Sequence, residues 1–231
     1  MTNMLNDIRN FFFPRHCVVC GNRLSAHEQG ICLRCDATLP YTRIGNTAGN
    51  AMEQCFWGRF PIQRASALFY YAKDGNVAQI LYAMKYHGQK KLCRLMGRRM
   101  AEHLSDTHFF DGIDHLVPVP LHPSRLRQRG YNQSEELAVG LSQRTDIPLL
   151  SNAIKRTKNN ATQTHKGSFA RWENTHELFA PTECAADNLR HKHILLIDDV
   201  STTGATLTAC ADALAGIEKL RISVLTLAWA K

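Results

Sequence analysis

The sequence contains no long run of apolar residues. The nearest approach to one, SVLTLAWA at residues 223–230, is far shorter than the ~18 residues that a membrane-spanning helix requires. Residues 1–16 hold only the short apolar run Phe11 to Phe13, which is too short for the apolar segment of a signal peptide. We therefore expect a cytoplasmic protein that is not inserted into a membrane.

Acidic residues are scarcer than basic ones. The 231 residues include 20 Asp and Glu against 28 Lys and Arg, which gives a formal net charge of +8. Charge of this sign favours anionic partners such as nucleic acid or phosphorylated metabolites, without choosing among them. Hydrophobic residues make up 44% of the chain, as in folded globular proteins, and its length allows one ordinary domain plus a small accessory module.

Two glycine-rich nucleotide-binding motifs are also missing. Neither GxxxxGK[ST] nor GxGxxG occurs in the chain, and no internal repeat is evident. A phosphate-binding site in this protein must therefore be built in another way.

Four of the eight cysteines form two CxxC pairs, Cys17 with Cys20 and Cys32 with Cys35. Two such turns supply the four sulfur ligands of a tetrahedral zinc site, which we expect to be structural because no ligand position stays open. A pair of disulfides is the alternative and needs an oxidising compartment; a redox CxxC would normally lie at a strand-to-helix junction. The remaining cysteines are interpreted as packing residues: Cys55, Cys93, Cys184 and Cys210.

The order of the expected elements indicates an α/β protein. A polar linker near residues 45–62 divides the chain into an N-terminal zinc ribbon with its linker, 1–58, and a larger domain, 59–231. Hydrophobic periodicity predicts strands over 65–71, 113–121, 147–157, 193–200 and 221–230, helices over 76–88, 90–104, 132–145 and 203–216, and a long polar loop over 158–176. From residue 113 onward this order predicts βαβ units and a mostly parallel sheet flanked by helices. Ligands of such sheets bind at the carboxyl ends of the strands.

The stretch HILLIDDVSTTGATL, residues 193–207, lies at one of these strand ends. Backbone N–H groups of residues 201–205 and the N-terminus of the following helix can surround a phosphate. Asp198 and Asp199 would repel that anion unless they bind something else, and the vicinal hydroxyls of a ribose are suitable hydrogen-bond donors. The stretch therefore predicts a site for a ribose 5-phosphate. The expected ligand-binding residues are Asp198, Asp199, Ser201, Thr202, Thr203, Gly204, Ala205 and Thr206.

This stretch resembles the phosphoribosyl pyrophosphate (PRPP) signature of type I phosphoribosyltransferases, and the whole chain is similar to the ComF/GntX family, the competence protein F group. That family joins a four-cysteine zinc ribbon to a phosphoribosyltransferase domain and carries a segment like VPVPLHPSRLRQRGYNQ, here residues 117–133, and a motif like AMKYHG, here residues 83–88. It also shows a pattern that corresponds here to Arg156, Thr162, Gln163, Arg171, Asn174 and Phe179.

The resemblance implies a type I phosphoribosyltransferase-like fold and the transfer of phosphoribosyl from PRPP to an acceptor, with Mg²⁺ bridging pyrophosphate and ribose oxygens. Catalytic roles are implied for Asp198, Asp199, Arg129, Lys166 and Arg171, and a pyrophosphate-binding role for Arg125 and Arg129. The loop from Lys158 to Arg171 would close over the ligand and exclude water. No segment that reads a particular base is identifiable; the helices within 76–104 are candidates.

The family name implies a role in DNA uptake, the natural competence of bacteria. Two alternatives to an enzyme therefore stay open. The first alternative is a protein that binds PRPP or a nucleotide without catalysis. The second is an accessory protein that contacts single-stranded DNA or a competence helicase through its basic surface.

Overall fold

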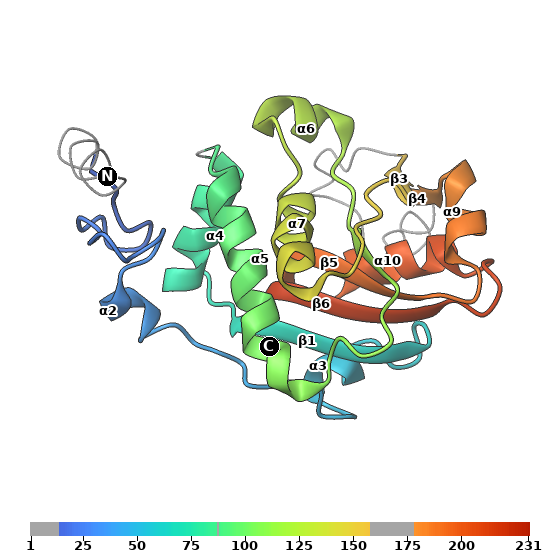
Figure 1. Ribbon diagram of the computed structural model, residues 1–231. Helices are drawn as coiled ribbons and strands as arrows, with labels where there is room; N and C mark the ends of the chain where they lie inside the picture. The colour runs from blue at the N-terminus through green and yellow to red at the C-terminus, as the bar shows by residue number, and fades with distance from the viewer. Residues whose placement is uncertain (1–13, 87, 158–177) are drawn as a thin grey trace, which may run out of the picture.

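A parallel sheet lies at the centre of the computed structural model, which describes residues 14–86, 88–157 and 178–231 (Figure 1). Its strand order is β1-β6-β5-β2, and all neighbouring strands are parallel. The strands are β1 (Ile62–Tyr70), β6 (Arg221–Trp229), β5 (His193–Ser201) and β2 (His115–Pro118). Their nearly continuous apolar sequences are typical of strands covered on both faces.

Successive residues of β5 point into two different hydrophobic cores, because side chains alternate along a strand. Leu195 and Ile197 pack under α4 (Asn76–Tyr86), α5 (Lys90–Leu104) and α7 (Gln133–Thr145). Ile194 and Leu196 belong to the other core, with residues of α9 (Glu183–Leu189) and α10 (Ala205–Leu214). The sheet is thus enclosed between helices, and its carboxyl edge is left for a ligand.

Helices α5 and α7 cross with their backbones in close contact at two glycines. A Cβ on Gly97 would lie 2.0 Å from the Leu137 carbonyl oxygen, and one on Gly140 would lie 2.1 Å from the Arg94 carbonyl oxygen. Any larger residue would force the helices apart. This crossing fixes where α7 begins, beside the carboxyl end of β5.

The expected α/β class and the mostly parallel sheet are confirmed. The expectation that residues 147–157 form a strand of that sheet is wrong. Within this range the structure has the short strand β3 (Ile154–Arg156), which pairs antiparallel with β4 (Phe179–Pro181) in a separate two-stranded sheet. Leu149 makes a single parallel bridge to Leu116, and Pro148 has no N–H group to continue a ladder.

Several short helices were not expected: α2 (Leu33–Asp36), α3 (Ala51–Gln54), α6 (Pro123–Arg129), α9 and the 3₁₀ turn Ser105–Thr107. Helix α6 lies between the predicted strand 113–121 and the predicted helix 132–145, where no element was expected. The His122 ring accepts a hydrogen bond from the Ser124 N–H at its start, and Gly130, with φ 77°, ends it. No residue of α6 is buried, so it has no apolar periodicity to reveal it.

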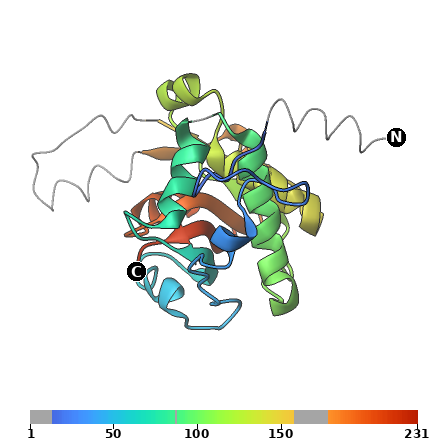
Figure 2. The same cartoon turned by 90° about the vertical axis from the view of Figure 1, so that its left-hand side faces the viewer.

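The N-terminal segment packs beside α4 and α5 (Figure 2). Leu24, Ile31 and Leu39 belong to the same buried cluster as the inner faces of these helices. The expected linker contains α3 and the fully buried Phe56, which lies in the core with α10. The division at residue 58 stays a prediction. No helix in the described parts of the chain combines the length and apolar character needed to cross a membrane.

Candidate functional site

Asp198 and Asp199 follow the continuously buried run 193–197 of β5, and each carboxylate has its own partner. Asp198 Oδ1 accepts hydrogen bonds from the Ser134 hydroxyl at 3.0 Å and from the Asp199 N–H at 2.9 Å. Asp199, which is 8% exposed, forms an ion pair with Lys85, with 3.1 Å between Oδ2 and Nζ. Helices α7 and α4 thus each supply one side chain to the acid pair.

Burial and the charge of Asp199 raise the pKa of Asp198 to about 7. The Asp199 N–H, the Ser134 hydroxyl and the Lys85 charge oppose this rise. The carboxyl group therefore gains or loses a proton near neutral pH. A ligand that donates hydrogen bonds to it favours the charged form.

The loop after β5 encloses a small pocket of about 50 Å³. Gly204 has φ 75° and precedes the first residue of α10, so backbone N–H groups of the first helical turn open toward the loop. The Arg59 guanidinium donates to the Thr203 carbonyl at 2.5 Å, and the Phe56 ring packs against Gly204. The pocket is lined by Asp198, Val200, Ser201, Thr202, Thr203, Gly204, Ala205, Thr206 and Leu207.

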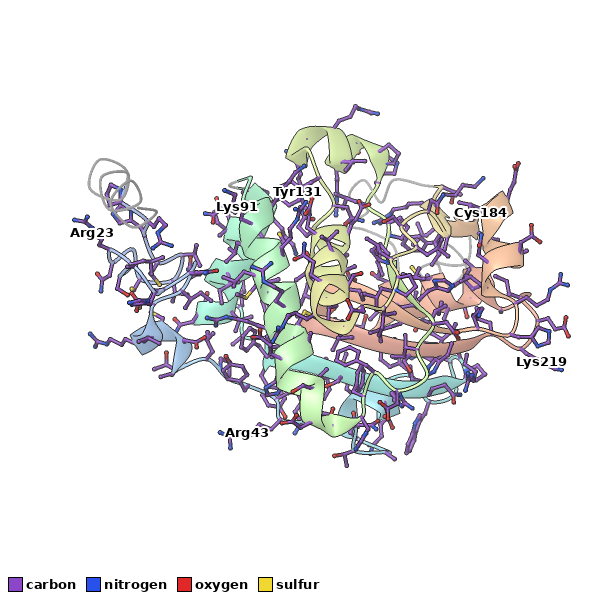
Figure 3. All side chains as sticks on the ribbon, in the orientation of Figure 1. Arg23, Arg43, Lys91, Tyr131, Cys184 and Lys219 are labelled. Atoms are coloured by element: carbon purple, nitrogen blue, oxygen red, sulfur yellow. The ribbon has the colours of Figure 1, made fainter. Side chains whose placement is uncertain are left out.

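The RGYNQ block, residues 129–133, contacts the last turn of α4. Arg129 Nη1 donates to Gln133 Oε1 at 2.8 Å, and its guanidinium carbon lies 5.5 Å from the ring centroid of Tyr86. The Tyr131 hydroxyl donates to the Met84 carbonyl; Figure 3 shows where Tyr131 lies. Arg129 is therefore held in place, whereas Arg125 is exposed on α6.

Sequence reasoning assigned no site role to Lys85, Ser134 or Arg156. Burial and the charge of Arg125 lower the pKa of Arg156, whose guanidinium carbon lies 5.4 Å from the Phe179 ring centroid. Its Nε is buried without a hydrogen-bond partner among the described residues. The family-like motifs AMKYHG and RGYNQ and the pattern that begins at Arg156 were the available signals. Lys166 and Arg171, and the whole loop from Lys158 to Arg171, lie outside the described residues.

The structure brings the four N-terminal cysteines together. Their sulfur atoms lie within 4.8 Å of one another, and the Sγ atoms of Cys20 and Cys32 are 3.8 Å apart. Four sulfurs at about 2.3 Å from a tetrahedral zinc ion lie about 3.8 Å from each other, so this geometry fits the ion. Burial alone would raise the pKa of Cys17, but backbone N–H groups, including that of Cys32, lower it to about 7 and favour the thiolate that binds metal. The cluster could hold a metal ion.

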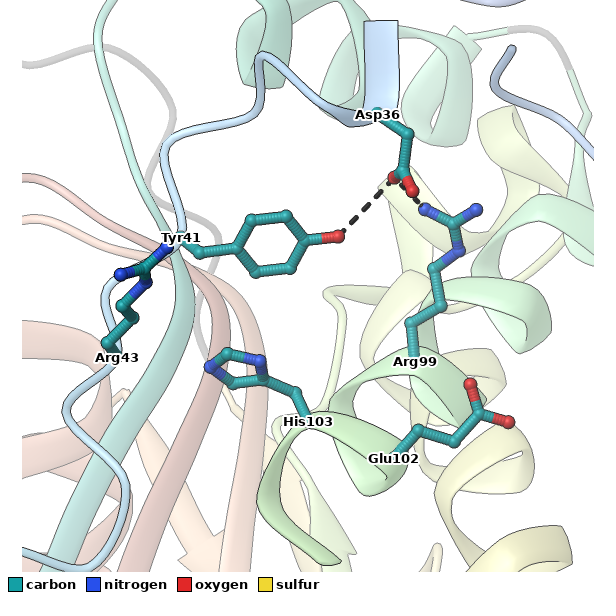
Figure 4. A pocket seen from close by; sticks show the side chains of 6 residues that line it. All are labelled: Asp36, Tyr41, Arg43, Arg99, Glu102 and His103. Atoms are coloured by element: carbon teal, nitrogen blue, oxygen red, sulfur yellow. Dashed lines mark hydrogen bonds and ion pairs between the residues drawn. The ribbon is translucent and has the colours of Figure 1, made fainter. Parts of the chain in front are cut away.

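A second pocket, of about 540 Å³, lies between this N-terminal segment and α5 (Figure 4). Asp36, next to Cys35, pairs with Arg99 and accepts a hydrogen bond from the Tyr41 hydroxyl at 3.3 Å. The Tyr41 ring centroid lies 5.3 Å from that of His103. These contacts join the segment that carries the cysteine cluster to α5.

Two solved structures share a limited structural similarity with this chain. A glutamine PRPP amidotransferase from B. subtilis, complexed with ADP and GMP, is 14% identical with a TM-score of 0.40, covering 58% of this chain and 26% of that one. A purine phosphoribosyltransferase from Pyrococcus horikoshii is 20% identical with a TM-score of 0.35, covering 58% of this chain and 74% of that one.

Sequence relatives cover more of the chain, although no family model matches it. Competence protein F of Haemophilus influenzae is 27% identical over 228 residues, 91% of this chain and 96% of that protein. The DNA utilization protein YhgH of Escherichia coli K12 is 26% identical over 201 residues, 86% and 83% of the two chains. Competence protein ComFC of Bacillus subtilis is 30% identical over 145 residues, 59% and 52%. The protein is a homologue of these competence and DNA utilization proteins.

Proposed function

We propose that this protein binds PRPP together with Mg²⁺ at the carboxyl end of β5 and transfers its phosphoribosyl group to an acceptor. The observation that carries the proposal is the acid pair, Asp198 and Asp199, placed directly before a phosphate-sized loop at the start of α10. The names of the relatives support a role in the uptake or use of DNA, where the net charge of +8 suits an anionic partner such as single-stranded DNA.

The two halves of the site suit the two halves of a ribose 5-phosphate. The ribose hydroxyls donate hydrogen bonds to the carboxylates of Asp198 and Asp199. The 5-phosphate accepts hydrogen bonds from backbone N–H groups of residues 201–206 and from the hydroxyls of Thr202 and Thr206. Binding a donor at Asp198 favours its ionised form, although burial and Asp199 raise its pKa to about 7.

In the transfer, the acceptor's nucleophilic atom forms a bond to C1 of the ribose while the bond from C1 to the pyrophosphate oxygen breaks. The electron pair of that bond leaves with pyrophosphate, and the acceptor's proton passes to solvent. Positive charge develops on the ribose ring, and the carboxylates of Asp198 and Asp199 stabilise it. We assign stabilisation of the departing negative charge to Arg125, Arg129, Lys166 and Arg171 from the sequence.

Magnesium would come with PRPP. In the parts of the chain that the structure describes, the cysteine cluster is the one group of at least three metal-binding side chains. The acid pair alone therefore makes no protein cage, and phosphate and ribose oxygens must supply most ligands of the ion, as Mg²⁺ prefers. When bound, the ion neutralises charge on the leaving pyrophosphate.

We further propose that zinc occupies the cysteine cluster and folds the N-terminal segment, that this segment and the catalytic domain divide near residue 58, and that the protein is cytoplasmic. Metal analysis of the purified protein should find one zinc ion per chain. The variant with Cys17→Ser and Cys20→Ser should contain none; zinc retained by that variant would contradict this assignment.

Calorimetry with PRPP and MgCl₂ tests the ligand. The wild-type protein should bind, and the variant with Asp198→Asn and Asp199→Asn should bind at least about 100-fold more weakly, because two charge-assisted hydrogen bonds are lost. Asp187→Asn, an exposed carboxylate on α9, is the matched control and should bind as wild type does. Equal binding by the double variant would disprove the site.

An assay of pyrophosphate release distinguishes phosphoribosyl transfer from PRPP binding alone. The protein with PRPP and Mg²⁺ is offered a panel of nucleobases and amines. Release that depends on one acceptor and on Asp198 supports a transferase. Tight binding of PRPP with no release for any acceptor favours the alternative, a binding protein without catalysis.

A further inference from the structure

The last turn of α4 contacts the candidate site at consecutive residues of the AMKYHG motif, to which the proposed function gives no role. The turn reaches both the acid pair and the RGYNQ block. The contacts are Met84 with the Tyr131 hydroxyl, Lys85 with Asp199 and Tyr86 with Arg129.

The Lys85 side chain is largely buried where it forms its ion pair with Asp199. Its side chain is 23% exposed and that of Asp199 is 11% exposed. Lysine is rarely buried to this extent without a partner, because its ammonium group is strongly hydrated. Lys85 also acts on the second acid: burial and Asp199 raise the pKa of Asp198, and the Lys85 charge is among the groups that oppose the rise.

Other elements supply little charge to balance the two acids. Cys93 on α5 is near Asp199, but burial raises its pKa to about 12 and keeps the thiol neutral. On the other side, Cys210 on α10 has a pKa that burial raises, and Arg156 on β3 acts on Asp198 from a distance. Ser134 on α7 is uncharged. Among the described residues, Lys85 is the cation in direct ion-pair contact with the acid pair.

We propose that Lys85 is a positioning residue of the ligand site, whose ammonium group orients the Asp199 carboxylate and offsets one of the two negative charges. This inference rests on the proposed function. Two uncompensated carboxylates beside the phosphate loop would repel a polyanion such as PRPP. With Lys85 in place, the acids can bind the sugar hydroxyls while the loop binds the phosphate. Tyr86 holds Arg129 from the same turn.

Calorimetry of the full chain with PRPP and MgCl₂, repeated between pH 6 and 9, tests this role. Lys85→Met should weaken binding about tenfold or more, and its binding should need a higher pH than that of wild type, since Lys85 no longer opposes the raised pKa of Asp198. Lys85→Arg keeps the charge and should bind within a few-fold of wild type. Lys91→Met removes an equal charge from an exposed position at the start of α5 and should bind as wild type does (Figure 3).

Unchanged affinity and pH profile in Lys85→Met would overturn the inference while leaving PRPP binding intact. A Lys85→Arg variant that melts like wild type yet binds as weakly as Lys85→Met would also overturn it, because the charge would then not be the cause. Wild-type protein that binds no PRPP contradicts the proposed function. In that case a double-mutant cycle of Lys85→Met with Asp199→Asn in urea still decides: coupling supports the orienting contact, and zero coupling refutes it.

Discussion

The two ends of strand β5 carry polar groups of opposite character. At the start, Asp114 accepts a hydrogen bond from the His193 N–H at 2.7 Å, and the His193 ring lies 2.8 Å from the Ser223 hydroxyl. At the far end, Asp198 and Asp199 lie side by side, and burial together with the Asp199 charge raises the pKa of Asp198 to about 7. The same apolar strand thus begins in a paired network and ends in a like-charge pair.

The difference separates stability from function. The His193 N–H and, less strongly, the neighbouring Lys192 lower the pKa of Asp114, so its charge stabilises the folded state. The charge of Asp198 is disfavoured in the folded state, so it opposes stability at neutral pH. Groups that break the local rules of pairing are expected where a ligand completes them.

The largest contrast is expected from removing one carboxylate at each end. Asp114→Ala leaves the His193 N–H without its charged acceptor and should lower the free energy of unfolding by about 2 kcal/mol, with PRPP binding unchanged. Asp198→Asn should keep or raise the free energy of unfolding and weaken PRPP binding. Urea unfolding at pH 7 and calorimetry measure both quantities. If Asp198→Asn lowers the free energy of unfolding as much as Asp114→Ala does, the proposed difference between the two ends of β5 is wrong.

Opposite pH dependences should follow from the same contrast. The folded-state pKa of Asp198 is raised from 3.8 to about 7, so its contribution to stability is present at low pH and is lost as the pH rises from 4 through 7. Burial and then the charges of Arg221 and Arg64 lower the pKa of His193 from 6.5 to about 4, so its contribution is present above 6.5 and is lost as the pH falls toward 4. The two slopes oppose each other in the wild-type protein.

Removing one of the two groups should therefore leave the pH dependence of stability that the other group causes. Relative to wild type, Asp198→Asn should gain stability as the pH rises from 4 to 7, and His193→Gln should lose stability as the pH rises from 4 to 6.5. Each change should be on the order of 3 kcal/mol, because one pKa unit corresponds to about 1.4 kcal/mol. Urea unfolding across this pH range measures it, with the slope of each difference as the readout. Parallel curves for all three proteins would refute the assigned protonation states.

The sequence predicted those parts of the fold that local pattern controls. The apolar stripe of residues 90–104 is the observed α5, and the run before Asp198 is the continuously buried part of β5. The pairing of residues 154–156 was predicted wrongly, because periodicity shows which face is buried but not which strand lies beside it. The exposed helix α6 had capping signals, Pro123 at its start and Gly130 after its end, but no apolar stripe.

The candidate site was predictable to the extent that it is continuous in sequence. The loop at residues 201–206 and the acid pair follow one another along the chain, and Asp198 and the loop line one pocket. Lys85 and Ser134 reach the acids from α4 and α7 through tertiary packing, which no local pattern specifies. The AMKYHG motif contains Lys85 and the RGYNQ block directly precedes Ser134, but neither motif shows what these residues contact.

The smallest effect is expected at Gly204, which shapes the functional end of β5. Its φ of 75° disfavours any side chain, and a Cβ would lie 2.8 Å from Phe56 Cε1. Gly204→Ala should therefore lower the free energy of unfolding by about 1 kcal/mol and weaken PRPP binding, since the loop must shift. Gly216, just beyond α10, is the matched control: a Cβ there would meet no atom within 4 Å, so Gly216→Ala should leave binding unchanged and stability equal or higher. If Gly204→Ala binds PRPP as tightly as Gly216→Ala does, the ligand does not depend on the conformation of this loop, and the phosphate must bind elsewhere.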